Sequence, residues 1–331
     1  MSNCDRDAQH LLERSPAGPE SVAPRGMRWL SGGTFLMGSD HHYPEEGPAR
    51  RVRVDGFWMD ESPVTNEQFA SFVKATGWVT LAETAPNPSD YPGILPEMIQ
   101  AGSLCFTSPP GPVSLNDFTQ WWSFRFGACW RAPEGPGSTL AGREDHPVVH
   151  VTHADAQAYA AWAGKALPTE AEWEFAARGG LEGEAYAWGS ELAPAGEMRA
   201  NYWQGTFPWE NLATDGFEGT SPVRIFPANG HGLFDMIGNV WEWTDDWYSD
   251  APPGKKSGDC CIPANPRGAL ERESVDPCQP DIQIGRKVLK GGSHLCAANY
   301  CERYRPAARY AQPVDTSTCH VGFRCVKRAG E

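Results

Sequence analysis

Glycine and proline are scattered along the whole chain, and this distribution limits what the chain can fold into. The 331 residues include 35 Gly and 29 Pro, spread through the sequence rather than gathered into one linker. Both residue types interrupt helices and strands, so long loops must connect short elements. The 14 Trp and 14 Phe supply large side chains that can pack between such loops. We therefore expect one loop-rich globular domain over residues 26–331, preceded by a disordered tail over residues 1–25.

Helix signals are confined to the first 180 residues. Three segments begin with a threonine that is followed three residues later by Gln, Asp or Glu, which is the spacing of a capping box. The expected N-cap residues are Thr65, Thr152 and Thr169, and the expected terminating glycines are Gly77, Gly164 and Gly179. Strands are predicted from β-branched and aromatic runs at residues 33–38, 51–59, 240–244 and 322–326. The sequence thus predicts an α+β fold with few helices, in which a bound metal ion could fix the long loops.

Two thiols, Cys296 and Cys301, lie five positions apart just after Gly291, Gly292 and Ser293. Thiolates are soft ligands that favour Cu(I), Zn(II) or iron–sulfur clusters, and two of them alone suit Cu(I) best. Zinc usually takes four ligands, often as Cys-x2-Cys pairs, and neither that pair nor an iron–sulfur spacing occurs here. A short-loop disulfide is equally consistent with the spacing.

The N-terminus, the lack of long apolar runs and the net charge lead to expectations about the compartment and partners of the protein. The N-terminus carries charged residues and has no apolar signal segment, and no run of about 18 apolar residues occurs, so we expect neither secretion nor a membrane partner. A cytoplasmic, thiol-reducing location follows as the expectation. The formal net charge of −14 offers no basic stripe for a phosphate backbone, which argues against a nucleic-acid partner.

Four motifs together resemble the formylglycine-generating enzyme family across roughly residues 26–327. They are LPTEAEWE at 167–174, GNVWEW at 238–243, the Gly-Gly-Ser turn with its two cysteines, and GFRC at 322–325. The first two motifs are shared by the wider sulfatase-modifying-factor superfamily, whereas the cysteine pair is typical of true formylglycine generators. The resemblance implies a variant of the C-type-lectin-like fold and an aerobic, bacterial type of enzyme.

The activity that this resemblance implies is the oxidation of a protein cysteine. A member of the family acts on an unfolded sulfatase polypeptide with a Cys-x-Pro-x-Arg motif and converts its cysteine to Cα-formylglycine, using O2 and a thiol reductant. The resemblance assigns Cys296 and Cys301 as the Cu(I) ligands, Ser293 as a polar residue close to the oxygen-binding position, and Trp241 as an aromatic wall of the pocket.

Two structural calcium sites are also implied by the resemblance. The first corresponds to Asn201, the carbonyl of Tyr202, Asp215 and the carbonyl of Phe217. The second corresponds to Asp235, the carbonyls of Gly238 and Val240, and Glu242. Oxygen ligands from glycine-rich loops suit this hard cation. The second set is the better supported by spacing, because its oxygens come from alternate positions of one short segment.

The chain departs from the family pattern at several positions. Secreted members have disulfide cysteines where this chain has Ala160, Ala177 and Pro306, which agrees with a cytoplasmic member and leaves Cys325 as a buried free thiol. An acidic residue that contacts the substrate arginine in other members falls at Pro63. An insertion at about residues 250–285 adds three further cysteines, predicted to be surface thiols: Cys260, Cys261 and Cys278.

Two other functions remain open from the sequence. A lectin-like scaffold does not dictate activity, so the chain could be a non-catalytic module that binds peptide or sugar. An iron oxygenase of the same superfamily would need a histidine-rich site, and no His-x3-His-x-Glu arrangement occurs. We expect His150 and His153 to be ordinary surface or cap residues on a loop.

Overall fold

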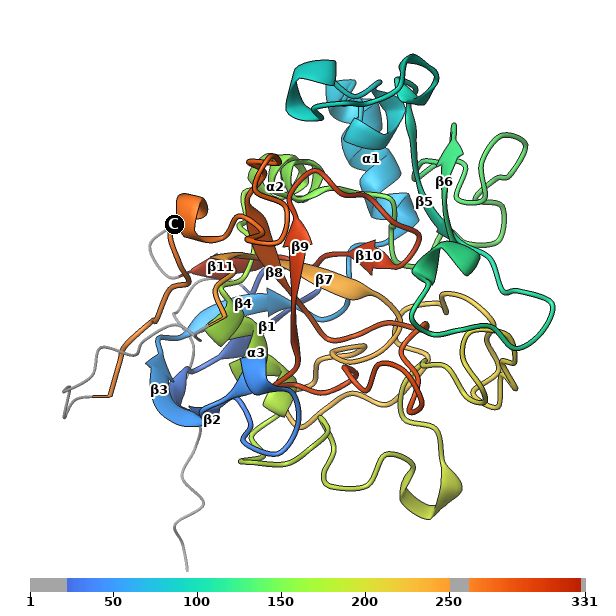
Figure 1. Ribbon diagram of the computed structural model, residues 1–331. Helices are drawn as coiled ribbons and strands as arrows, with labels where there is room; N and C mark the ends of the chain where they lie inside the picture. Colours follow the sequence, from blue (N-terminus) through green and yellow to red (C-terminus); the bar gives the residue numbers. More distant parts are fainter. Residues whose placement is uncertain (1–22, 251–261, 329–331) are drawn as a thin grey trace, which may run out of the picture.

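The computed structural model describes residues 23–250 and 262–328, so most of the predicted disordered tail lies outside the described residues. Short strands and three α-helices are joined by long loops (Figure 1). The helices are α1 (Asn66–Thr76), α2 (His153–Trp162) and α3 (Glu170–Arg178). The strands are β1 (Met27–Leu30), β2 (Gly33–Met37), β3 (Arg50–Val54), β4 (Phe57–Asp60), β5 (Gly102–Phe106), β6 (Trp122–Phe126), β7 (Trp241–Trp247), β8 (Arg286–Lys290), β9 (Arg309–Pro313), β10 (Val321–Gly322) and β11 (Val326–Arg328).

The largest sheet of the described residues has the order β10-β7-β8-β9 and lies at the centre of Figure 1. Strands β7, β8 and β9 are antiparallel, whereas β10 runs parallel to β7. A second sheet, β1-β4-β11, joins segments from near the two ends of the chain. The β2-β3 and β5-β6 pairs form separate ribbons, and the β5-β6 hairpin projects to one side of the central sheet. The fold is therefore α+β with few helices, as the sequence predicts.

All three capping boxes are confirmed. The side chains of Thr65, Thr152 and Thr169 each accept a hydrogen bond from the backbone of the third helical residue. Helices α1 and α3 end at Gly77 and Gly179, whose φ angles of 71° and 59° lie in the left-handed region that glycine adopts without strain. These short-range patterns place the helix ends within a residue of the prediction.

Two strand predictions need correction. The predicted strand 51–59 is two strands, β3 and β4, separated at Gly56, where a Cβ atom would approach the Trp29 ring to 2.6 Å. β3 pairs with β2, whereas β4 pairs with β1 and β11, so the chain must change sheets between them. The predicted strand 322–326 also divides, because β10 joins β7 and β11 joins β4.

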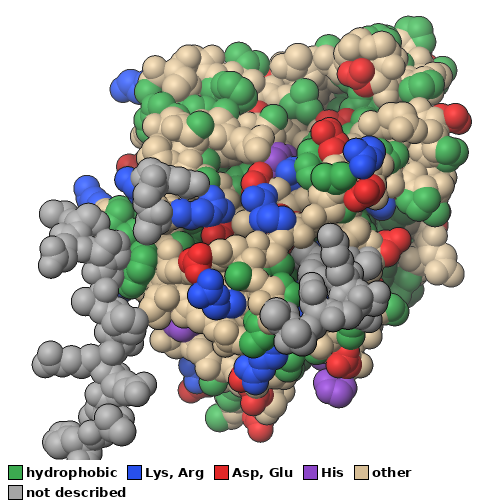
Figure 2. Space-filling view, turned by 90° about the vertical axis from the view of Figure 1, so that its left-hand side faces the viewer, with side chains coloured by type: hydrophobic (Ala, Val, Ile, Leu, Met, Phe, Trp, Pro, Cys, Tyr) green, Lys and Arg blue, Asp and Glu red, His purple; other side chains and the backbone are tan. Residues whose placement is uncertain are grey.

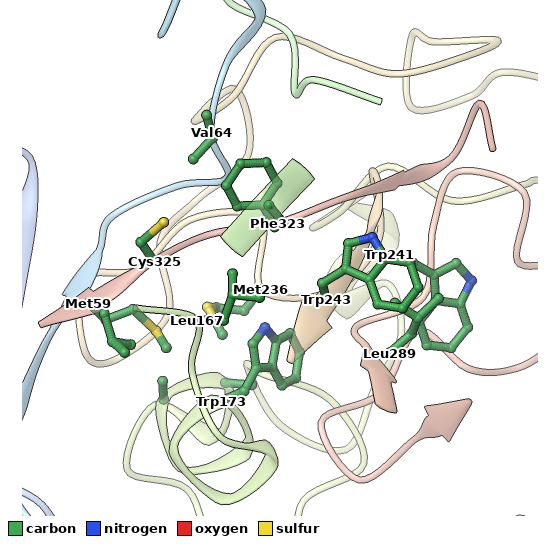
Figure 3. Close-up of a cluster of buried hydrophobic side chains, with 14 of the residues drawn as sticks. Met59, Val64, Leu167, Trp173, Met236, Trp241, Trp243, Leu289, Phe323 and Cys325 are labelled. Atoms are coloured by element: carbon green, nitrogen blue, oxygen red, sulfur yellow. The ribbon is translucent and has the colours of Figure 1, made fainter. Parts of the chain in front are cut away.

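The core lies between α3 and the central sheet. Trp173 of α3 and Trp243 of β7 are completely buried, and Figure 3 shows their rings near Met236 and Leu289. Cys325 is completely buried beside the same cluster and is not in a disulfide, so the expectation of a buried free thiol is confirmed.

Buried ion pairs fasten α3 to the sheet. Glu174 accepts hydrogen bonds from Lys290 (3.0 Å) and Arg178. Burial alone would raise the pKa of Glu174, but these two cations outweigh it and hold the pKa at about 2. Glu170 of the same helix pairs with buried Arg309 on β9 (2.7 Å). Glu170 and Glu174 of the LPTEAEWE motif therefore have a structural role, because they hold α3 against the sheet.

No helix in the described part of the chain is long and apolar enough to span a bilayer.

Candidate active site

The segment after β8 folds back on itself and brings the two thiols together. Gly291 and Gly292 turn the chain with φ angles of 95° and 71°. A Cβ on Gly292 would lie 2.8 Å from the carbonyl oxygen of Arg303, so only glycine allows this approach. Two further turns follow, in which the Cys301 N–H donates to the Ala297 carbonyl (2.8 Å) and the Cys296 N–H to the Ser293 carbonyl (2.9 Å).

The Sγ atoms of Cys296 and Cys301 lie 3.4 Å apart. A disulfide bond is about 2.05 Å long, and both residues are free cysteines, so the structure has two converging thiols rather than a bridge. Cys296 is 2% exposed and Cys301 is half-buried. Two soft donors that converge in this way suit a soft cation such as Cu(I).

Both thiols line a cavity of about 400 Å³. Ser293 and Trp241 line the same cavity, so the structure brings together all four residues that the resemblance assigned to the reaction. The Ser293 N–H donates to the Cys296 sulfur (3.4 Å), which ties this residue directly to the pair. Phe118 and Tyr310, which are 62% and 45% exposed, contribute an apolar rim, so the cavity opens to solvent.

The two thiols have opposite electrostatic environments. Burial and the neighbouring Cys301 raise the pKa of Cys296 well above its ordinary value. A hydrogen bond from Cys296 and the cation of Arg303 outweigh burial at Cys301 and lower its pKa to about 7. Cys301 is therefore the thiol of the pair that ionises as the pH rises through about 7, while Cys296 keeps its proton and donates a hydrogen bond to it.

Arg303 is a site residue that the motifs did not single out. Its guanidinium group pairs with Glu45 (2.5 Å), lies 3.8 Å from the centre of the Tyr43 ring, and lines the cavity with Cys301. A sequence signal for it existed, because Arg303 is a cation only two positions after Cys301, and a nearby cation lowers the pKa of a thiol.

The first expected calcium set contains an unpartnered acceptor. Asn201 Oδ1 is buried and has no hydrogen-bond partner, while its Nδ2 donates to the Gly219 carbonyl (2.8 Å). The Tyr202 carbonyl and Asp215 Oδ2 both accept from the Gln204 side chain. Phe217 joins the group through its N–H, which donates to Asp215 Oδ1 (3.0 Å). This concentration of oxygen acceptors fits a hard cation.

The second expected calcium set fits only in part. Burial, with a contribution from Glu242, raises the pKa of Asp235 to about 6, and a cation would relieve that cost. Glu242, however, already accepts from both Arg324 (2.7 Å) and Trp173 (2.7 Å), so its charge is balanced. Gly238 approaches Asn201 so closely that a Cβ would lie 2.4 Å from the Asn201 carbonyl oxygen, and Val240 is buried. The first set thus holds a buried acceptor without a partner, Asn201 Oδ1, whereas Glu242 of the second set already has two donors.

The histidine prediction is wrong in detail. His150 is completely buried, with its ring nitrogens 2.7 Å from Ser103 Oγ and 2.9 Å from the Pro133 carbonyl, and His153 is a buried first residue of α2. His146 and His150 have His-x3-His spacing, but those two contacts occupy the ring of His150. Within residues 23–250 and 262–328, no group of three or more His, Cys, Asp or Glu side chains is placed to hold a metal ion.

The cysteines of the insertion are only partly visible. Cys278 is exposed and free, as expected for a surface thiol, whereas Cys260 and Cys261 lie outside the described residues. On the face in Figure 2, acidic and basic side chains of the described residues are interspersed.

Residues 14–329 match the family described as "Sulfatase-modifying factor enzyme 1-like domain", and the chain belongs to that family. It is 52% identical over 298 residues to the formylglycine-generating enzyme of Mycobacterium tuberculosis. The aligned region covers 90% of this chain and 96% of that protein.

Other relatives agree. The chain is 46% identical to the formylglycine-generating enzyme of Thermomonospora curvata, over 93% of this chain and 94% of that one. Among solved structures, PvdO from Pseudomonas aeruginosa superimposes with a TM-score of 0.61 at 21% identity, covering 92% of this chain and 94% of PvdO. At that identity the likeness shows a shared fold.

Proposed function

We propose that this protein is a copper-dependent oxidase that converts the cysteine of a Cys-x-Pro-x-Arg motif in an unfolded sulfatase to Cα-formylglycine, with O2 and a thiol reductant. The observation that carries the proposal is the 3.4 Å approach of Cys296 and Cys301 in an open cavity. The relatives named formylglycine-generating enzymes support the same reaction.

The metal ligands in this proposal are Cys296 and Cys301, whose soft sulfur atoms suit Cu(I). Cu(I) bound there supplies a redox-active centre for the reduction of O2. The protein prepares the site by lowering the pKa of Cys301 to about 7 through the Cys296 hydrogen bond and the Arg303 cation, so one ligand is easily deprotonated. Cys296, which keeps its proton more firmly, would have to be deprotonated to serve as the second ligand. Overall, the target thiol, O2 and two reductant thiols yield the aldehyde, hydrogen sulfide, water and an organic disulfide.

The cavity also restricts the target. A volume of about 400 Å³ accommodates one or two side chains, but not a folded element. A target cysteine therefore reaches the thiols only from an extended, unfolded segment. The exposed rings of Phe118, Tyr300 and Tyr310 at the rim can pack against the proline of the motif. Trp241 and Ser293 shape the inner wall, where the smaller reactant O2 must fit.

The remaining parts of the proposal concern structure and location. The first calcium set holds a structural Ca²⁺ through Asn201 and Asp215, and the second set is proposed with less support because Arg324 balances Glu242. The small sheets and long loops are compatible with a C-type-lectin-like fold. A cytoplasmic location agrees with the described cysteines, which are all free: Cys105, Cys129, Cys278, Cys296, Cys301, Cys319 and Cys325.

Mass spectrometry of a Cys-x-Pro-x-Arg peptide tests the proposal directly. The peptide is incubated with the protein, Cu(I), O2 and a thiol, and we expect loss of sulfur with gain of an aldehyde. Cys296→Ser and Cys301→Ser should each abolish the product and lower copper binding, whereas Cys278→Ser, which alters an exposed thiol, should change neither.

The same experiment separates the enzyme from a non-catalytic module that binds peptide or sugar. A binding module would retain the peptide after both site cysteines are replaced and would consume no O2. Aldehyde formation that persists in both serine variants would refute the assignment of the thiol pair.

A further inference from the structure

A second cavity, of about 550 Å³, lies behind the wall of the active-site cavity. Leu295 lines both cavities, so the two are separated by little more than one layer of residues. Two thiols that have no part in the proposed reaction, Cys105 of β5 and Cys319 just before β10, line this second cavity. Cys105 is 2% exposed and Cys319 is half-buried.

These two cysteines are neighbours across a strand pairing. Leu104 pairs in parallel with Thr318, through hydrogen bonds from the Leu104 N–H to the Ser317 carbonyl (3.2 Å) and from the Cys319 N–H to the Leu104 carbonyl (3.1 Å). The next residue on each segment is a cysteine. Side chains alternate along extended chain, and the cavities follow that rule: Leu104 and Thr318 line the active-site cavity, and the cysteines line the other.

The backbone spacing suits a covalent bridge. Paired segments lie about 4.8 Å apart, and disulfides form between Cα atoms roughly 4.4–6.8 Å apart. At present each sulfur has its own contacts. Cys105 Sγ lies 3.6 Å from the Pro133 carbonyl oxygen, and Cys319 Sγ accepts from the Phe106 N–H at 3.3 Å. Rotation of the two side chains within the cavity would exchange these weak contacts for a bond.

We propose that Cys105 and Cys319 form a reversible disulfide when the protein meets a low-molecular-weight organic disulfide. The thiolate of one cysteine attacks the small disulfide, forms a mixed disulfide and releases one thiol. The second cysteine then attacks the mixed disulfide, forms the protein bridge and releases the other thiol. Two electrons and two protons pass from the protein pair to the small molecule, which is reduced to two thiols. This chemistry does not depend on the function proposed above.

The bridge would reinforce the pairing of two segments that line the active-site cavity. Leu104, Thr318 and His320 line that cavity, so a covalent link between the next residue of each segment holds this part of its wall together. Burial raises the pKa of Cys105 and raises that of Cys319 to about 12, so exchange is slow at neutral pH and a bridge, once formed, persists.

Peptide mapping tests the inference. The full chain is incubated with oxidised glutathione at pH 8, free thiols are alkylated, and proteolytic peptides are analysed by mass spectrometry without reduction. We expect a linked pair of peptides that contain Cys105 and Cys319, and a rise in Tm of about 5 °C over the reduced protein. Added dithiothreitol should reverse both changes.

Matched variants sharpen the result. Cys105→Ser and Cys319→Ser should each lose the linked peptide and the rise in Tm, whereas Cys129→Ser, which replaces another buried thiol outside the cavity, should keep both. If a variant fails to fold, the peptide map of the wild-type protein still tests the proposal. If Cys278 acquires glutathione while Cys105 and Cys319 remain alkylated as free thiols, or if either links to a different cysteine, the proposal is overturned.

Discussion

One carbonyl oxygen, that of Asn239, accepts two hydrogen bonds from His294: one from the backbone N–H at 3.0 Å and one from ring Nδ1 at 2.8 Å. Since a carbonyl can only accept, Nδ1 carries the hydrogen. Burial lowers the pKa of His294 to about 4, so the ring is neutral at pH 7. The contact joins the loop of Gly238 and Val240 to the turn that holds Cys296 in place.

His294→Ala should therefore destabilise the protein by about 2 kcal/mol and weaken Cu(I) binding, because it leaves the Asn239 carbonyl without its side-chain donor. His294→Asn retains an N–H donor and should recover much of both properties. Urea unfolding and competition with a Cu(I) chelator would measure them. Equal behaviour of the two variants would contradict a role for the Nδ1 contact.

Arg303→Gln should raise the pKa of Cys301 from about 7 towards the ordinary thiol value, because it removes the cation beside the thiolate. The rate of iodoacetamide alkylation of metal-free protein, measured against pH, reports this change. In the wild type the rate should fall as the pH drops through about 7, and in the variant the fall should occur at higher pH. Cys301→Ser provides the background rate, and an unshifted profile would exclude Arg303 as the cause.

Gly292→Ala should cost about 3 kcal/mol, because the new methyl group meets the backbone of residues 303 and 304 and the φ angle of 71° is unfavourable for alanine. Gly142→Ala is the matched control. Gly142 has a φ angle of 75°, but no atom lies within 4 Å of the position that a Cβ would occupy, so only the backbone cost of about 1 kcal/mol applies. Similar losses in chemical unfolding would mean that the close approach to residue 303 is unimportant.

Removal of calcium should lower the Tm if the first set is a Ca²⁺ site. We expect a decrease with EGTA and its recovery on addition of Ca²⁺, since the buried Asn201 Oδ1 then regains a partner. Asn201→Ala and Asp215→Asn should make the Tm insensitive to EGTA. An EGTA effect that survives in both variants would place the cation elsewhere.

Acid should destabilise the protein through buried histidine. Burial lowers the pKa of His150 from 6.5 to about 4, so the unfolded chain binds a proton between these values that the folded protein does not. Stability from this group is complete above pH 6.5 and is lost as the pH falls to 4, by about 3 kcal/mol at most. His150→Gln should reduce the slope of unfolding free energy against pH over that range. An unchanged slope would show that His150 does not contribute.

Features set by neighbouring residues were predictable from the sequence. Thr169 and Glu172 form a capping box within one turn, so the start of α3 could be placed from residues alone. The thiol pair is likewise local, because a single tight turn from Ala297 to Cys301 connects the two cysteines. For these features no distant contact competes with the short-range signal.

Features that depend on distant partners were not predictable in this way. Strand β1 is defined by its pairing with β4, and β5 by its pairing with β6 across a 15-residue loop, and nothing in the strands themselves specifies those partners. Arg303 becomes a site residue only because Glu45 and Tyr43, from far along the chain, hold it beside Cys301. Such an arrangement emerges when the whole chain has folded.

The small volume beside the thiol pair also limits the time during which a target polypeptide can bind. Under the proposed function, the target segment must reach the thiols while it is still extended, and hydrophobic collapse takes about 10–100 microseconds in chains of about 100 residues. Capture during synthesis, at roughly 5–20 residues per second, leaves a far longer interval than capture after release. The shape of this pocket therefore makes timing, as much as sequence, a determinant of which polypeptides it can modify.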